Sequence, residues 1–120
     1  MKRIYHLSAC TTCQRILKEI NPPENITLQD IKTAPITAKQ LDEMKIRAGS
    51  YEALFSRIAM KYRQWGLNEK KLTENDYREL ILKEYTFLKR PVIIVKDKIF
   101  IGNSPKNIAA AKEAIRNSGK

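Results

Sequence analysis

The first thirty residues carry the hydrophobic pattern of a strand, a loop, a helix and a second strand. Residues 2–7 are rich in apolar side chains and run into a Ser-Ala-Cys-Thr-Thr turn. Prolines at 22 and 23 stop the helix that follows, because proline has no amide donor and its ring clashes with the preceding turn. Residues 26–30 alternate as a strand. The apolar face of the helix recurs at helical spacing in Cys13, Ile16, Leu17 and Ile20.

The middle of the chain has helical periodicity. Thr37 and Gln40 have the spacing of a capping box, and Gly49-Ser50 ends the helix that they begin. Thr73 is placed to cap a later helix carrying Tyr77, Leu80, Ile81 and Tyr85. Between the two, an i, i+4, i+8, i+11 stripe predicts another helix ending at Gly66, and we expect its aromatic side chains to pack in the core rather than stack on bases. That stripe is Leu54, Ile58, Tyr62 and Trp65.

The last thirty residues predict a hairpin and a helix. Residues 92–95 and 99–101 are apolar and flank a Lys-Asp-Lys turn. Ser104 is placed as the N-cap and Pro105 as the first residue of a helix whose buried stripe is Ile108, Ala111 and Ile115. The predicted order is therefore β-α-β, helices, then β-β-α.

Composition limits the class of protein. With 120 residues, 42% hydrophobic and 30% charged, residues 1–120 are expected to form one domain with a single core. No apolar run approaches the roughly 20 residues of a membrane helix, and the N-terminal segment lacks the apolar stretch of a signal peptide, so we expect a cytoplasmic protein that does not enter the membrane.

The 23 Lys and Arg against 13 Asp and Glu give a net charge of +10, concentrated in the second half. Such a charge suits nucleic acid, an acidic protein or a small oxyanion, and equally a solvated surface with no partner.

The two cysteines stand together as Cys10-Thr11-Thr12-Cys13. A disulfide that closes so small a loop removes little conformational entropy from the unfolded chain, which argues against a disulfide that serves to stabilise the fold. Zinc needs about four ligands, and the chain adds only one histidine, His6, so no metal site is expected unless two chains share it. At a strand-to-helix junction, free helical amides stabilise a thiolate at Cys10, and Cys13, one turn later, is placed to resolve an adduct. Two buried, inert cysteines are the alternative.

The same helix start is a candidate anion site. The amides of Thr11, Thr12 and Cys13 point where an oxyanion would meet Cys10. Arg90 is the leading cationic partner, because Pro91 restricts its backbone, and Arg57 and Arg63 are weaker candidates. His6 either tunes the Cys10 pKa or simply completes the strand.

Three blocks of sequence together resemble the thioredoxin-fold arsenate reductase family (ArsC-like), which also contains the Spx transcription regulators. They are Ile4-Tyr5-His6-x-x-Ala9-Cys10-x-Thr12, then residues 53–57 with Tyr62 and Gly66-Leu67, then residues 88–93 with Arg90-Pro91. The resemblance implies an α/β fold, a thioredoxin-like (glutaredoxin-like) mixed sheet with a helical insertion at about residues 37–86 between its βαβ and ββα parts.

The resemblance also assigns roles. It implies that Cys10 is the nucleophile and that His6 helps to keep the Cys10 thiol ionised. It also implies that Arg90 binds an oxyanion and that Arg57 lies within one residue of the position of a second oxyanion-binding arginine. Pro91 is implied to follow a cis peptide bond. The resemblance implies no bound cofactor, with glutathione or a thioredoxin- or glutaredoxin-type protein as reductant. A small oxyanion or a thiol or disulfide compound is the expected substrate, and we expect a monomer without direct DNA binding.

Two departures from the glutaredoxin-linked arsenate reductases shift the expected substrate. Asn103 stands where those enzymes have a third arginine, and loss of a charge-assisted contact of ~1.5–3 kcal/mol would weaken arsenate binding roughly ten- to a hundredfold. Cys13 stands where they usually lack a cysteine. Both favour a thiol-disulfide reductase or a redox sensor over dedicated arsenate reduction. The alternative is an Spx-type redox-sensing regulator that binds the RNA polymerase α subunit, for which Gly49 is a loose counterpart of an expected glycine.

Overall fold

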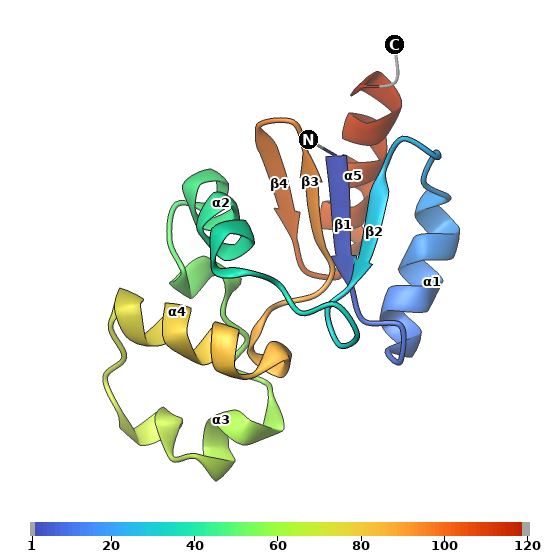
Figure 1. The fold of residues 1–120 in the computed structure, drawn as a ribbon. Coiled ribbons are helices and arrows are strands. Elements are labelled where there is room, and N and C mark those ends of the chain that lie inside the picture. The colour runs from blue at the N-terminus through green and yellow to red at the C-terminus, as the bar shows by residue number, and fades with distance from the viewer. Residues whose placement is uncertain (1, 119–120) are drawn as a thin grey trace. The chain divides into compact units, whose positions relative to one another are not determined.

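The sheet is built by the first and last parts of the chain, in a computed structural model that describes residues 2–118. Strands β1 (Lys2–His6) and β2 (Thr27–Asp30) are parallel, while β3 (Val92–Val95) is antiparallel to β1 and to β4 (Lys98–Ile101). The sheet order is β2-β1-β3-β4 (Figure 1). In this register Ile4 lies opposite Ile93, which places both side chains on one face.

Two helices cover that face of the sheet. They are α1 (Thr11–Ile20) and α5 (Pro105–Ser118). α1 ends where Asn21 takes a left-handed conformation, and α5 begins where the N–H of Asn107 donates to the Ser104 hydroxyl. The shared core consists of Ile4, Ile16, Ile20, Ile26, Ile93, Val95, Ile108, Ala111 and Ile115.

The chain forms two compact units. One contains the residues up to Pro35 together with those from Arg90 onward, and the other is Ile36–Lys89. The second unit is helical, as the periodicity predicts. Its helices are α2 (Ala38–Ala48), α3 (Met60–Gln64) and α4 (Glu74–Lys83), with short 3-10 turns η1 (Glu52–Leu54), η2 (Leu67–Glu69) and η3 (Tyr85–Phe87). The capping box expected at Thr37 begins α2, and Thr73 caps α4 as predicted. At Thr73 the structure adds the reciprocal bond from Asp76, which completes a second capping box.

One predicted helix is shorter than expected, because only its last part, Met60–Gln64, is α-helical. The stripe from Leu54 to Trp65 is interrupted, and Ile58, one of its members, is 94% exposed. The reason is non-local pairing: Phe55 forms a β-bridge with Leu88, and Ser56 N–H donates to the carbonyl of Phe87 at 2.7 Å. These bonds hold the backbone extended where helical periodicity alone predicts a helix.

An aromatic cluster fills the helical unit. The Phe55 ring lies 4.9 Å from Tyr77, 5.0 Å from Phe87 and 5.9 Å from Tyr62, measured between ring centroids. Trp65 contacts Phe87 edge-on at 5.4 Å but remains 37% exposed. The tyrosine rings therefore pack as expected, whereas the tryptophan lies at the rim of this core.

Candidate active site

Cys10 lies between the end of β1 and the first residue of α1. Its backbone is extended (φ −92°, ψ 117°), its N–H donates to the carbonyl of Leu7 at 3.0 Å, and its carbonyl accepts the Gln14 N–H at 3.1 Å. Cys10 is therefore the N-cap residue of α1, with its side chain partly exposed. The strand, cysteine loop and helix occur in the predicted order.

The helix start stabilises the thiolate of Cys10. The backbone N–H of Cys13 is the main cause of a Cys10 pKa below its ordinary value, opposed by partial burial and helped by the Cys13 thiol, the N–H of Thr12 and the charge of Arg90. Donors aimed at a sulfur favour its charged form, which is the nucleophilic form of a cysteine. Cys10 thus has the environment of a reactive thiol.

Cys13 lies in the opposite environment. Its side chain is 1% exposed, and burial raises the pKa of its thiol above the ordinary value, reinforced by the neighbouring Cys10 sulfur. The Leu7 N–H and the charge of Arg90 act in the other direction. The two cysteines form an asymmetric pair within hydrogen-bonding reach, in which Cys10 ionises first.

Arg90 and Pro91 join the site from the start of β3. The Arg90–Pro91 peptide bond is cis, the isomer that the family resemblance implies. The Arg90 charge acts on both cysteines, and its Nη1 is buried without a hydrogen-bond partner among the described residues. A buried guanidinium nitrogen of this kind is a ready donor for an anion.

The loop that follows β4 is hydrogen-bonded to Pro91. Gly102 N–H donates to the carbonyl of Pro91 at 3.0 Å, and the Asn107 amide donates to the carbonyl of Gly102 at 2.8 Å. Asn103 follows Gly102 directly and is exposed. This bond holds the loop that contains Asn103 against Pro91, the residue that follows Arg90 and precedes β3.

The other residues predicted for the site lie in different elements of the fold. Thr11 and Thr12 are the first two residues of α1, and the N–H of Thr12 contributes to the Cys10 environment. His6 ends β1 with 9% exposure, and its Nδ1 has no hydrogen-bond partner in the described part of the chain. Arg57 belongs to the helical unit, where it donates to Glu52 at 2.7 Å and to the Tyr77 hydroxyl at 2.8 Å. Roles for His6 and Arg57 stay predictions.

A tether that the sequence analysis missed holds the cysteine loop. The Ser8 hydroxyl donates to the carboxylate of Asp30 at the end of β2, and the Ser8 carbonyl accepts the side-chain amide of Gln14 in α1. The N–H of Ile31 also donates to the carbonyl of His6 at 2.9 Å. Only the strand topology could have indicated these contacts, because parallel strands bring the residues that follow them to one edge of the sheet.

Residues 2–118 contain neither a metal-binding cluster nor a membrane-spanning helix. No three His, Cys, Asp or Glu side chains in this range come together as a group able to hold a metal ion. Within the same range, no helix has the length and apolar character needed to span a bilayer.

Comparison with known proteins decides the family. The sequence model of the ArsC family matches residues 5–111. The chain belongs to the ArsC family. ArsC membership supports thiol-dependent redox chemistry, and the mixed four-stranded sheet with its helices is the thioredoxin-like fold of that family.

Solved structures similar to this ArsC-family chain share its fold. The YFFB protein (PA3664) superposes with a TM-score of 0.76 at 23% identity, covering 92% of this chain and 98% of its own. The arsenate reductase from Vibrio cholerae gives 0.72 at 16% identity, covering 92% and 96%. An arsenate reductase (ArsC) related protein from Brucella melitensis gives 0.68 at 24% identity, covering 91% and 92%. No curated protein matches the chain.

Proposed function

We propose that this ArsC-family protein is a thiol-disulfide oxidoreductase in which Cys10 attacks and Cys13 resolves. The observation that carries the proposal is the opposite environment of the two sulfurs: amide donors lower the pKa of Cys10, while burial raises that of Cys13. Such a pair supplies a thiolate to an incoming substrate and keeps the second thiol protonated until the first has reacted.

The first step consumes the Cys10 thiolate. It attacks one sulfur of a disulfide or glutathione adduct, forms a mixed disulfide, and displaces the other sulfur, which leaves as a thiolate with the bonding electron pair and takes up a proton. The Arg90 charge beside both cysteines would stabilise the attacking thiolate and an anionic substrate group.

The second step releases the product. Cys13 loses its proton and attacks the Cys10 sulfur, so that a Cys10–Cys13 disulfide forms and the substrate sulfur leaves as a thiolate. The substrate gains two electrons and the cysteine pair loses two. Two glutathione thiols, or the dithiol of a thioredoxin- or glutaredoxin-type protein, would then reduce the pair.

Arsenate fits the same two steps. Cys10 would displace hydroxide from As(V), and attack of Cys13 on the Cys10 sulfur would leave the S–As electron pair on arsenic, giving As(III). Asn103 in place of an arginine supplies no positive charge for this oxyanion, which favours disulfide substrates over arsenate.

The test compares Cys10→Ser and Cys13→Ser in glutathione-linked reduction of a small mixed disulfide. Cys10→Ser should abolish turnover, because hydroxyl oxygen is not ionised at neutral pH. Cys13→Ser should still form the first adduct but turn over more slowly. Retention of full activity in Cys10→Ser would refute the proposal.

The regulator reading stays a prediction. In an Spx-type protein the cysteine pair would sense oxidation, and binding to the RNA polymerase α subunit would replace catalysis. A column carrying purified α subunit should then retain the protein. Failure to bind in both the reduced and the oxidised state would dismiss this alternative.

A further inference from the structure

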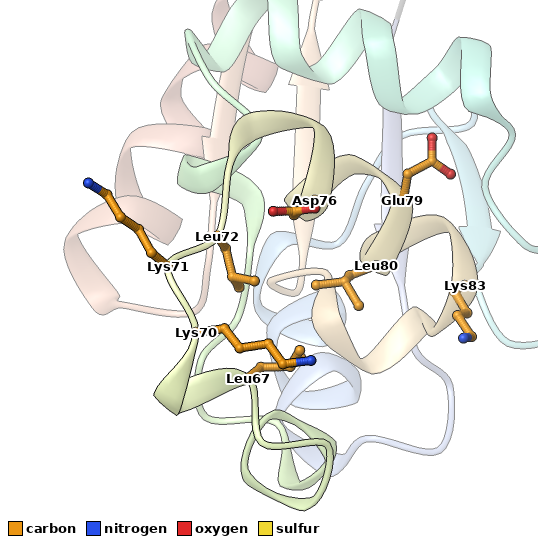
Figure 2. Close-up of a pocket in the computed structure, with 8 residues that line it drawn as sticks. All are labelled: Leu67, Lys70, Lys71, Leu72, Asp76, Glu79, Leu80 and Lys83. Atoms are coloured by element: carbon orange, nitrogen blue, oxygen red, sulfur yellow. The ribbon is translucent and has the colours of Figure 1, made fainter.

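The helical unit contains a hollow that the proposed chemistry does not use. It has a volume of about 360 Å³, within the range of small ligand sites, and lies between the segment from Leu67 to Leu72 and helix α4. Figure 2 shows Leu72 and Leu80 projecting toward each other from the loop and the helix. Leu67 is buried in its floor, and the other two leucines are half-buried. The hollow thus offers apolar surface that is only partly covered.

The rim of the hollow carries more positive than negative charge. Its lining holds three lysines, Lys70, Lys71 and Lys83, against two carboxylates, Asp76 and Glu79. The Thr73 N–H, which donates to Asp76 at 2.8 Å, is the main cause of an Asp76 pKa below its ordinary value, and the charge of Lys70 adds to it. Glu79 pairs with Arg78 at 3.1 Å. The lining therefore keeps a net positive charge, with Lys70 and Lys71 exposed to a ligand.

The loop beside the hollow presents unused backbone donors. Lys70 is extended (φ −111°, ψ 147°), and the N–H groups of Lys71 and Leu72 form no hydrogen bond in the described part of the chain. Extended backbone with free donors can pair with another extended chain, whereas a lipid tail has nothing to pair with it. This feature favours a peptide ligand over an acyl chain.

We propose that this hollow, together with Lys70 and Lys71, binds an acidic peptide segment of a partner protein that carries leucine-like side chains. Apolar side chains would enter between Leu72 and Leu80, and carboxylates would lie against the lysines. A second copy of the chain is a poor occupant, because two molecules of charge +10 repel each other. The proposal is independent of the cysteine chemistry.

Trp65 provides a built-in reporter of this site. It is the single tryptophan of the chain and is 37% exposed. Lys83, which lines the hollow, holds its ammonium 5.4 Å from the centroid of the Trp65 ring. A ligand that draws Lys83 toward a carboxylate should change the emission of Trp65.

The test titrates the full chain with a dye-labelled ten-residue peptide of alternating Leu and Asp, read by anisotropy and by Trp65 emission. We expect saturable binding at micromolar concentration that weakens as salt rises. Peptides of alternating Ser and Asp, or of Leu and Lys, should not bind. The Cys10→Ser variant should bind like the wild type, which separates this site from the proposed function.

Two sets of variants assign the binding to the hollow. Lys70→Glu with Lys71→Glu should weaken binding by at least about tenfold. Lys18→Glu with Lys98→Glu makes the same charge change at exposed positions of the other unit and should leave binding within about twofold. Leu72→Ser should also weaken it. Absence of binding, equal loss in both charge variants, or binding to phosphatidylglycerol vesicles but not to the peptide would each overturn the proposal.

Discussion

The backbone N–H of Cys13 is the principal stabiliser of the Cys10 thiolate, while the Cys13 thiol itself is buried. One residue therefore serves the site twice, through its amide as a donor to the nucleophile and through its sulfur as the second member of the pair. A serine at position 13 keeps the amide and removes the sulfur. The two contributions can thus be separated by a single substitution.

The first prediction concerns the pH dependence of Cys10. Alkylation of Cys13→Ser by iodoacetamide should rise with pH and reach its midpoint below the usual cysteine value of about 8.5, because the amide of residue 13 remains in place. The stabilised thiolate is present above this lowered pKa and lost as pH falls through it. In Cys10→Ser, Cys13 should react far more slowly, since it is buried. Equal rates for the two cysteines would contradict the assignment.

The second prediction concerns the tether between Ser8 and Asp30. Ser8→Ala removes the hydroxyl that donates to Asp30 but keeps the negative charge of Asp30. With the cysteine loop less firmly held, its amides should align less well with the Cys10 sulfur, so the alkylation midpoint should move upward and the rate at pH 7 should fall severalfold.

The control for the tether is Ser50→Ala in the helical unit, where Ser50 accepts the Ala53 N–H at 3.1 Å. This variant also loses one side-chain hydrogen bond to a nearby group. Its alkylation profile should match that of the wild type. An unchanged profile in Ser8→Ala would show that the tether does not position the loop.

The third prediction concerns arsenate. Asn103 lies in the loop that is bonded to Pro91, so Asn103→Arg would bring a guanidinium near Pro91, the residue that follows Arg90. One added charge-assisted contact should lower the KM for arsenate by about tenfold or more. Asn117→Arg, at an exposed position near the end of α5, makes the same charge change elsewhere. No gain in Asn103→Arg, or an equal gain in both, would count against this geometry.

The fourth prediction concerns acid stability. Asp42 accepts from Arg78 at 2.9 Å and from the Tyr51 hydroxyl at 2.6 Å, and the Arg78 contact is the main reason that its pKa falls to about 2. Since an unfolded aspartate titrates near 3.9, this carboxylate stabilises the fold above about pH 4, and the stabilisation disappears as pH falls toward 2.

The measurement is thermal unfolding of Asp42→Asn followed by circular dichroism. The variant should melt roughly a few degrees below the wild type at pH 7, and the gap should become much smaller as pH falls toward 2. Asp97→Asn, in the exposed turn between β3 and β4, should leave the melting temperature unchanged at both values. A gap as large at pH 2 as at pH 7 would show that Asp42 acts through something other than its charge.

Local signals predicted much of the fold. The helix that begins beside the cysteines, the capping box at Thr37, the N-cap at Thr73 and the start of α5 at Ser104 each depend on residues within one turn of each other. Capping and hairpin formation are short-range, so the sequence pattern suffices for them. The position of Cys10 at the strand-to-helix junction and of Cys13 in the first turn of α1 follows from the same local pattern.

Long-range contacts explain what the sequence could not predict. Phe55 pairs with Leu88, more than thirty residues later, and this bridge overrides the helical periodicity around Ile58. Similarly, Ser8 meets Asp30 because β1 and β2 are parallel neighbours, and neither residue carries a local motif. The tether therefore appears only when the strands are assembled.

The most direct test of the account is mass spectrometry of the Cys13→Ser variant after exposure to oxidised glutathione. We predict a single glutathione adduct on Cys10, stable because the resolving thiol is gone, and in the wild type an internal Cys10–Cys13 disulfide with no retained glutathione. An adduct on Cys13 in Cys10→Ser at the same rate, or an unmodified Cys10 in Cys13→Ser, would contradict the assignment of Cys10 as the nucleophile.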